Sequence, residues 1–220
     1  MKQQQQRIER IRKWLIVFLL LTTISAFGVA IASIYEYITL LDMPATASTE
    51  EIPAETRQLL GQISIGAFMP RLLFFLITAV VFLIWTYRLF DGATSVLKDD
   101  SLNNPGWVVS FFIIPFMNFF LPLLSFLDLS KKQSVQRFGH KERKKSALVI
   151  SWWVFFLFSL LVSMTTGFFV TEDATVGMLR NDALSTSISE FTLTIAGILA
   201  VLVVNMLTRQ QEAIIEEEST

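Results

Sequence analysis

Three sets of residues in this sequence could do chemistry, and the first is an asparagine between two prolines in an apolar run. Residues 107–127, WVVSFFIIPFMNFFLPLLSFL, contain Pro115, Asn118 and Pro122. A carboxamide there could line a cavity, or coordinate an ion or a lipid head group. The role that we favour is that it bonds the backbone groups that the prolines leave unpaired, because proline lacks an N–H and breaks a helix. Both roles make Asn118 a candidate functional residue.

Arg88 and Asp91 form the second candidate set. They stand three residues apart at the end of an apolar block, so a helix places them on one face. Such a pair could bind a lipid phosphate or form part of a gate, and it could also be an interfacial salt bridge. Trp107, which opens the broken apolar run, is a further candidate.

The third set is a run of cations directly after the broken apolar segment. The residues that we expect to bind anionic lipid are Lys131, Lys132, Lys141, Arg143, Lys144 and Lys145. Cations beside a membrane attract anionic lipid by about 1 kcal/mol each. The same charges would in any case fix the topology. The acidic tail at residues 216–218 could instead pair with residues 141–145, at little gain per exposed pair.

Few residues in the sequence could support catalysis. There is no cysteine and a single histidine, His140, so thiolate chemistry is excluded and a zinc site is not expected. The sequence contains no HExxH, no GxSxG and no P-loop. We therefore expect no enzymatic activity, no cofactor, no metal and no nucleic-acid partner.

Long apolar blocks indicate an integral membrane protein. Of the 220 residues 53% are hydrophobic, and 20 are Phe. A helix needs about 20 apolar residues to cross a bilayer, and blocks of that kind cover residues 14–34, 67–90, 147–171 and 191–207. We predict an all-α membrane protein with a single domain over residues 1–220.

The connections between the blocks are polar. Apolar residues at helical spacing within residues 42–66 predict a short amphipathic helix on the membrane surface. Residues 128–146 are expected to form a basic loop, and residues 172–190 a polar link. Arg71, near the start of the second block, is expected to snorkel outward, which would leave a bundle without buried charges.

Charge decides between two topologies, because cytoplasmic loops carry an excess of Lys and Arg. With the N-terminus inside, a spanning segment at 107–127 places 8 Lys and Arg inside and 10 outside. A re-entrant segment places 15 inside and leaves Arg57, Arg71 and Arg180 outside. We therefore predict four spanning helices, both termini cytoplasmic, and a re-entrant segment at 107–127; a kinked fifth span is the alternative.

The tryptophans are consistent with this topology. They are Trp14, Trp85, Trp107, Trp152 and Trp153. The topology places all five near the cytoplasmic interface, where amphipathic rings prefer to lie.

A recognisable pattern lies between residues 85 and 127: Trp85 with Arg88, the entry Pro105-Gly106-Trp107, and then Pro115, Asn118 and Pro122. With this pattern the sequence resembles a bacterial membrane family known as domain of unknown function 4328. The chain departs from the family pattern at Asp91, where the family often has Asn, and at Leu121 and Leu123, where it often has polar or basic residues. The resemblance implies a multi-pass membrane protein, and the family has no assigned activity to transfer to this chain.

These observations favour a non-enzymatic accessory or scaffold protein of the bacterial inner membrane. Its basic cytoplasmic face would bind anionic lipid, a membrane-protein partner or a second copy of the chain. The alternative is a small channel or transporter that uses the segment at 107–127 as a filter or gate.

Overall fold

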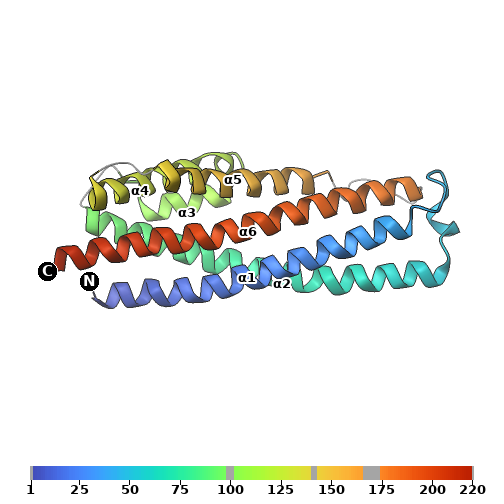
Figure 1. The fold of residues 1–220 in the computed structure, drawn as a ribbon, viewed down its shortest axis with the longest axis horizontal. Coiled ribbons are helices and arrows are strands. Elements are labelled where there is room, and N and C mark those ends of the chain that lie inside the picture. The colour runs from blue at the N-terminus through green and yellow to red at the C-terminus, as the bar shows by residue number, and fades with distance from the viewer. Residues whose placement is uncertain (1, 98–101, 140–142, 166–173, 220) are drawn as a thin grey trace. The chain divides into compact units, whose positions relative to one another are not determined.

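The computed structural model describes residues 2–97, 102–139, 143–165 and 174–219, with side chains from residue 6 to residue 217. Helices cover most of this part of the chain (Figure 1). They are α1 (Lys2–Thr39), η1 (Thr49–Glu51), α2 (Ala54–Leu97), α3 (Pro105–Ile113), η2 (Met117–Phe119), α4 (Leu121–Phe138), α5 (Arg143–Ser163) and α6 (Val176–Ser219).

Among the described residues, four helices are long and apolar enough to cross a membrane. These segments are Gln6–Thr39, Ala54–Leu97, Arg143–Ser163 and Val176–Glu217. Each contains or overlaps one of the four apolar blocks in the sequence, so the predicted all-α membrane fold is confirmed. A helix of 44 residues is about 66 Å long, which exceeds the roughly 30 Å of a hydrocarbon core. The two 44-residue helices, α2 and α6, therefore continue well beyond the length that a bilayer requires.

Two of the predicted connections are wrong because they are parts of these long helices. Residues 54–66 belong to α2 and do not form a separate surface helix, and residues 176–190 belong to α6. The periodic apolar residues of the predicted segment 42–66 do not all lie on an exposed face. Ile52 and Leu60 are buried in a protein core, which explains their spacing without a membrane surface.

The predicted basic loop is also largely helical. α4 continues from Leu121 to Phe138 and ends at Gly139, whose φ of 70° is the left-handed conformation that glycine adopts readily at a helix end. Within α4, Lys132 pairs with Asp128 at 3.1 Å, one helical turn away. The segment 128–138 therefore presents its cations from a rigid helix.

The described chain divides into two compact units, and unit 2 comprises Leu21–Phe75 and Phe155–Ala196. Its apolar core contains Leu40, Ile52, Leu60 and Val176. Backbone bonds hold the start of α6 against the connection between α1 and α2, including Val176 N–H to the Ala47 carbonyl at 2.9 Å. Gly177 allows this approach, because a Cβ there would lie 2.9 Å from the Ala45 carbonyl oxygen.

Unit 1 comprises Met1–Leu20, Leu76–Val154 and Gly197–Thr220, and its core is aromatic. The ring of Phe126 is fully buried, and its centroid lies 5.9 Å from Trp85, 5.6 Å from Phe90 and 5.7 Å from Trp152. The indole N–H of Trp85 donates to Thr208 Oγ1 at 3.1 Å, which joins α2 to α6. In this core the indole ring of Trp85 packs against other rings, and its N–H group is hydrogen-bonded.

The tryptophans fall into two groups. Trp14 and Trp107 are 58% and 61% exposed, as residues at a membrane interface should be. Trp85, Trp152 and Trp153 are buried among other side chains. Their indoles are core residues, and the position of all five near a cytoplasmic interface stays a prediction.

Candidate functional site

The segment 107–127 forms two helical limbs separated by a break. The residue before Pro115, Ile114, is extended, because the proline ring disfavours helical backbone at the preceding residue. The chain then passes through η2 and re-enters a helix at Leu121. Pro122 lies in the first turn of α4, where its missing N–H breaks no helical bond.

The two limbs pack against each other as a helical hairpin. The rings of Phe112 on α3 and Phe126 on α4 are edge to face, with centroids 6.3 Å apart. Asn103, just before α3, donates from Nδ2 to Ser125 Oγ on α4 at 3.1 Å. The nine residues of α3 span about 13 Å, too short to cross a bilayer.

A tryptophan on a neighbouring helix satisfies one backbone carbonyl of the break. Trp153 on α5 donates its indole N–H to the Phe119 carbonyl at 2.9 Å. The Asn118 backbone N–H donates to the Ile114 carbonyl at 3.0 Å. Asn118 Oδ1 is buried and accepts no hydrogen bond from the residues that the structure describes. The oxygen of the Asn118 side chain therefore does not cap the break, and Trp153 contributes the side-chain bond to its backbone.

The other candidate residues, Trp107, Arg88 and Asp91, make separate contacts. Trp107 stacks on Phe111 in its own helix, with centroids 6.5 Å apart. Arg88 lies in the interior of α2, and its guanidinium is 5.9 Å from the ring centroid of Tyr87. The backbone carbonyl of Asp91 accepts bonds from the hydroxyls of Thr94 and Ser95. α2 therefore continues past Arg88 and Asp91 to Leu97.

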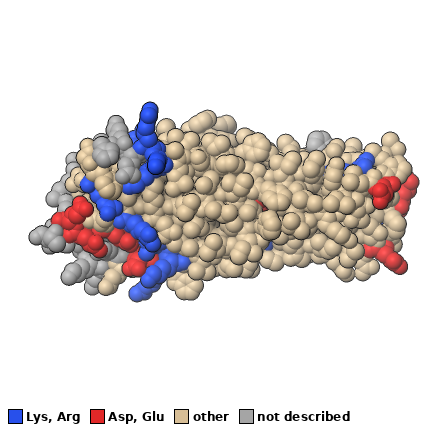
Figure 2. Space-filling view, in the orientation of Figure 1, with Lys and Arg blue, Asp and Glu red and all other residues tan. Residues whose placement is uncertain are grey.

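The basic residues after the hairpin line α4 and the start of α5. Lys131, Arg143 and Lys144 are exposed, and no ion pair involves them within the described parts of the chain. Lys132 pairs with Asp128, and the Lys145 ammonium lies 4.4 Å from the ring centroid of Phe138. Lys141 lies outside the described residues. Figure 2 shows Lys and Arg side chains gathered, with Asp and Glu among them, where α1 starts and α6 finishes.

The acidic end of α6 meets two of the basic helices of unit 1. Glu217 lies 3.9 Å from Arg137 on α4, and Glu212 lies 3.9 Å from Arg12 on α1. Both distances are long for an ion pair, so each contributes little on its own. The sequence suggested residues 141–145 as partners of this acidic end, and residues 141 and 142 lie outside the described residues.

The pattern of prolines, Asn118 and tryptophans coincides with a known family. The sequence profile of the family described as domain of unknown function (DUF4328) matches residues 48–209. The chain belongs to this family. The predicted resemblance is confirmed, and it extends well beyond the hairpin. Comparison with curated proteins and with solved structures finds no match.

Within the DUF4328 match, unit 2 contains a buried ion pair that the sequence analysis missed. Arg71 on α2 contacts Glu190 on α6 through two bonds, Nη2 to Oε1 at 2.7 Å and Nε to Oε2 at 3.2 Å. Their side chains are 15% and 7% exposed. Arg71 also lies over the ring of Phe75, 5.2 Å from its centroid. The expected outward snorkelling of Arg71 and a bundle without buried charges are therefore wrong.

A signal for this pair was present in the sequence. Glu190 directly precedes the last apolar block, and Arg71 lies near the start of the second. Because these opposite charges lie at corresponding ends of two apolar blocks, an ion pair between them could have been predicted. The assignment of residues 172–190 to a surface link removed Glu190 from consideration.

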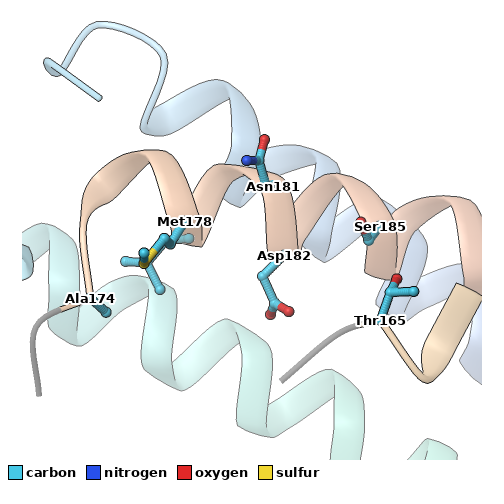
Figure 3. Close-up of a pocket in the computed structure, with 7 residues that line it drawn as sticks. Thr165, Ala174, Met178, Asn181, Asp182 and Ser185 are labelled. Carbon is cyan, nitrogen blue, oxygen red and sulfur yellow. The ribbon is translucent and has the colours of Figure 1, made fainter. Parts of the chain in front are cut away.

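Unit 2 also has a cavity of about 330 Å³ beside the first turns of α6. Its walls include Thr165, Ala174, Met178, Leu179, Asn181, Asp182 and Ser185. Figure 3 shows most of these side chains projecting from one stretch of α6, with Thr165 from the end of α5. Asp182 is the one ionisable side chain among these residues, so they contain no acid–base pair.

A second set of polar groups missed by the sequence analysis lies inside unit 1. Ser130 and Gln133 on α4 and Gln210 on α6 are almost fully buried. Four of their side-chain atoms have no hydrogen-bond partner among the described residues. A buried polar atom without a partner costs about 1–3 kcal/mol, so this group requires an explanation.

Breaking the Arg71–Glu190 pair should destabilise the protein more than removing it whole. Arg71→Met or Glu190→Met leaves one charge buried without its partner, and we expect each to lower the free energy of unfolding by about 3–5 kcal/mol. The double variant removes both charges, so its loss should be smaller than that of either single variant. Denaturation of the protein in detergent would measure these differences.

Arg57→Met is the matched control, because Arg57 is an exposed arginine on the same helix. Its effect should be within about 0.5 kcal/mol. A double variant whose loss equals the sum of the two single losses would contradict the interpretation of a coupled buried pair.

Proposed function

We propose that this protein is a non-enzymatic accessory or scaffold protein of the bacterial inner membrane, whose basic unit 1 lies on the cytoplasmic side and binds anionic lipid head groups. A protein partner or a second copy of the chain would be an additional ligand of the same face. The concentration of cations in unit 1 carries the proposal.

The charges divide unevenly between the sequence ranges of the two units. The ranges of unit 1 contain 15 Lys and Arg and 10 Asp and Glu, whereas those of unit 2 contain 3 and 9. The 15 cations of unit 1 are the same residues that the charge rule assigns to the cytoplasm. Because anionic lipid attracts juxtamembrane cations, this distribution supports both the orientation and the ligand.

The position of the cations on helices strengthens the proposal. Lys131 lies on α4, whose cap at Gly139 ends it sharply, and Arg143 and Lys144 start α5. A helix holds a side chain in place at less entropic cost than a loop does on binding. These exposed cations therefore form a preordered surface for phosphate groups.

The exposed apolar side chains of the hairpin support a re-entrant position in the membrane, beside the exposed cations. Its break exposes apolar side chains, with Phe116 at 88% and Ile113 and Phe120 each at 68% exposure. Exposed apolar groups of this size are typical of a surface in contact with lipid or protein. In the proposed topology the break lies in the membrane, and α3 and α4 lead back to the same side.

Removing the exposed cations should weaken lipid binding. At about 1 kcal/mol per cation, the variant Lys131→Gln/Arg143→Gln/Lys144→Gln should bind phosphatidylglycerol roughly 100-fold more weakly. The measurement is a lipid titration of the detergent-solubilised protein, with phosphatidylcholine as the neutral lipid. The control Lys131→Arg/Arg143→Lys/Lys144→Arg keeps every charge and should bind as the wild type does. Equal affinity of the glutamine variant would refute the proposed ligand.

Cysteine labelling in intact cells tests the orientation, because the natural chain has no cysteine. Thr46, between α1 and η1, and Gln136, on α4, are both exposed. An impermeant maleimide should label Thr46→Cys in intact cells and Gln136→Cys only after permeabilisation. The reverse pattern would overturn the proposed topology while leaving the lipid titration interpretable.

Solute passage through the hairpin is the second candidate function, and it rests on the unpartnered Oδ1 of Asn118. If that oxygen coordinates a permeating ion, K⁺ flux into proteoliposomes should be lost in Asn118→Leu and kept in Met117→Leu. Met117 is the matched control because it precedes Asn118 in η2. Flux that survives in Asn118→Leu, or no flux in the wild type, would remove this candidate.

A further inference from the structure

One face of α4 in unit 1 is polar and yet turned into the protein. Ser130, Gln133 and Ser134 follow the spacing i, i+3, i+4 and therefore share a face. Each of the three is 1% exposed. Gln210 on α6, 2% exposed, donates from Nε2 to Ser134 Oγ at 3.3 Å, so this face is turned towards α6.

Only some of the polar side-chain atoms on this face have a hydrogen-bond partner among the described residues. Ser134 Oγ accepts from Gln210 and donates to the Ser130 carbonyl at 2.8 Å. Four other atoms have no hydrogen-bond partner among the described residues. They are Ser130 Oγ, Gln133 Nε2, Gln133 Oε1 and Gln210 Oε1. Buried amides and hydroxyls are nearly always bonded, so four such atoms on facing helices indicate a bound molecule.

We propose that these side chains form an internal hydration site, in which ordered water joins α4 to α6. The four atoms require a ligand that both donates and accepts, because Gln133 Nε2 can only donate and the two amide oxygens can only accept. A metal cation would need acceptors alone, and an anion would need donors. Water satisfies both kinds of group, and it commonly makes about three bonds at such positions.

The surroundings favour a ligand of this size. Leu129, one turn before Gln133, and Leu207, one turn before Gln210 and Gln211, are fully buried. These leucines add no polar group to the site, and their burial leaves the site without open contact to solvent at one turn before Gln133 and Gln210. Water there would add directional bonds between the second limb of the hairpin and α6, which apolar packing alone does not supply.

Radiolytic hydroxyl-radical labelling tests the site in the wild-type protein. Radicals form from bound water and attack the side chains beside it, so Leu129 and Leu207 should be oxidised several-fold faster than Leu15. Leu15 is an equally buried leucine on α1 and serves as the control. Oxidation of Leu129 and Leu207 at the rate of Leu15 would overturn the proposal.

The thermal stability of Gln133→Met gives an independent readout. If water satisfies the amide, replacing it with an apolar side chain of similar length loses those bonds, and the Tm should fall by about 2–6 °C. If the amide is unpaired, the same substitution removes an unsatisfied polar group, and the Tm should rise or stay unchanged. A rise or no change would refute the hydration site.

Leu129→Met is the matched substitution, because it changes a buried apolar side chain one turn away on the same helix. We expect it to shift the Tm less than Gln133→Met and to leave the labelling of Leu207 unchanged. Gln133→Met, by contrast, should reduce the labelling of Leu207 to the rate of Leu15. The wild-type labelling needs no variant, so the proposal can be tested even if Gln133→Met does not fold.

Discussion

Backbone that leaves a helix inside a membrane protein must find hydrogen bonds within the protein, because hydrocarbon offers none. At the break between α3 and α4, Trp153 supplies one such bond, because its indole N–H donates to the Phe119 carbonyl. The ring of the same residue packs edge to face against Phe112, with centroids 6.0 Å apart. One side chain therefore both satisfies the break and holds the first limb against the core. The hairpin depends on the aromatic core of unit 1 as much as on its prolines.

A second tryptophan of unit 1 also combines ring packing with a hydrogen bond from its indole N–H. Trp85 is fully buried, stacks on Phe126 and directs its N–H to Thr208 on α6. Trp152 completes the cluster around Phe126. Large rings suit this role because they fill volume while their polar tips bond at the edge of the packed surface. In this chain, these contacts hold Trp85 in the core near the end of an apolar block.

Charge is arranged differently in the two units. In unit 1 the cations are numerous, and Lys131 on α4 and Arg143 and Lys144 at the start of α5 are exposed. In unit 2 the Arg71 guanidinium is held by both oxygens of Glu190, with Phe75 beside it. A two-point contact compensates for desolvation far better than a single long ion pair does. Buried and exposed charges therefore need separate physical explanations in this protein.

Much of the hairpin could be predicted from the residues. Pro115 and Pro122 indicated where helix must stop and restart, and the structure breaks between Ile114 and Phe120. The roles of polar side chains were harder to predict. Asn118 was the expected cap, yet the side-chain bond to the break comes from Trp153, 34 residues further along the chain. Nothing local in the sequence connects that indole to the break, because the contact exists only after α5 packs against the hairpin.

The sequence by itself determined the class of protein, the four long apolar helices and the uneven distribution of cations. These properties follow from composition, block length and charge, each of which acts locally or along one helix. Only the tertiary structure decided that residues 54–66 and 176–190 extend the long helices, that three tryptophans are core residues, and that Arg71 meets Glu190. Each of these outcomes depends on which surface a helix packs against. The position of a residue in the sequence does not specify its partner on another helix.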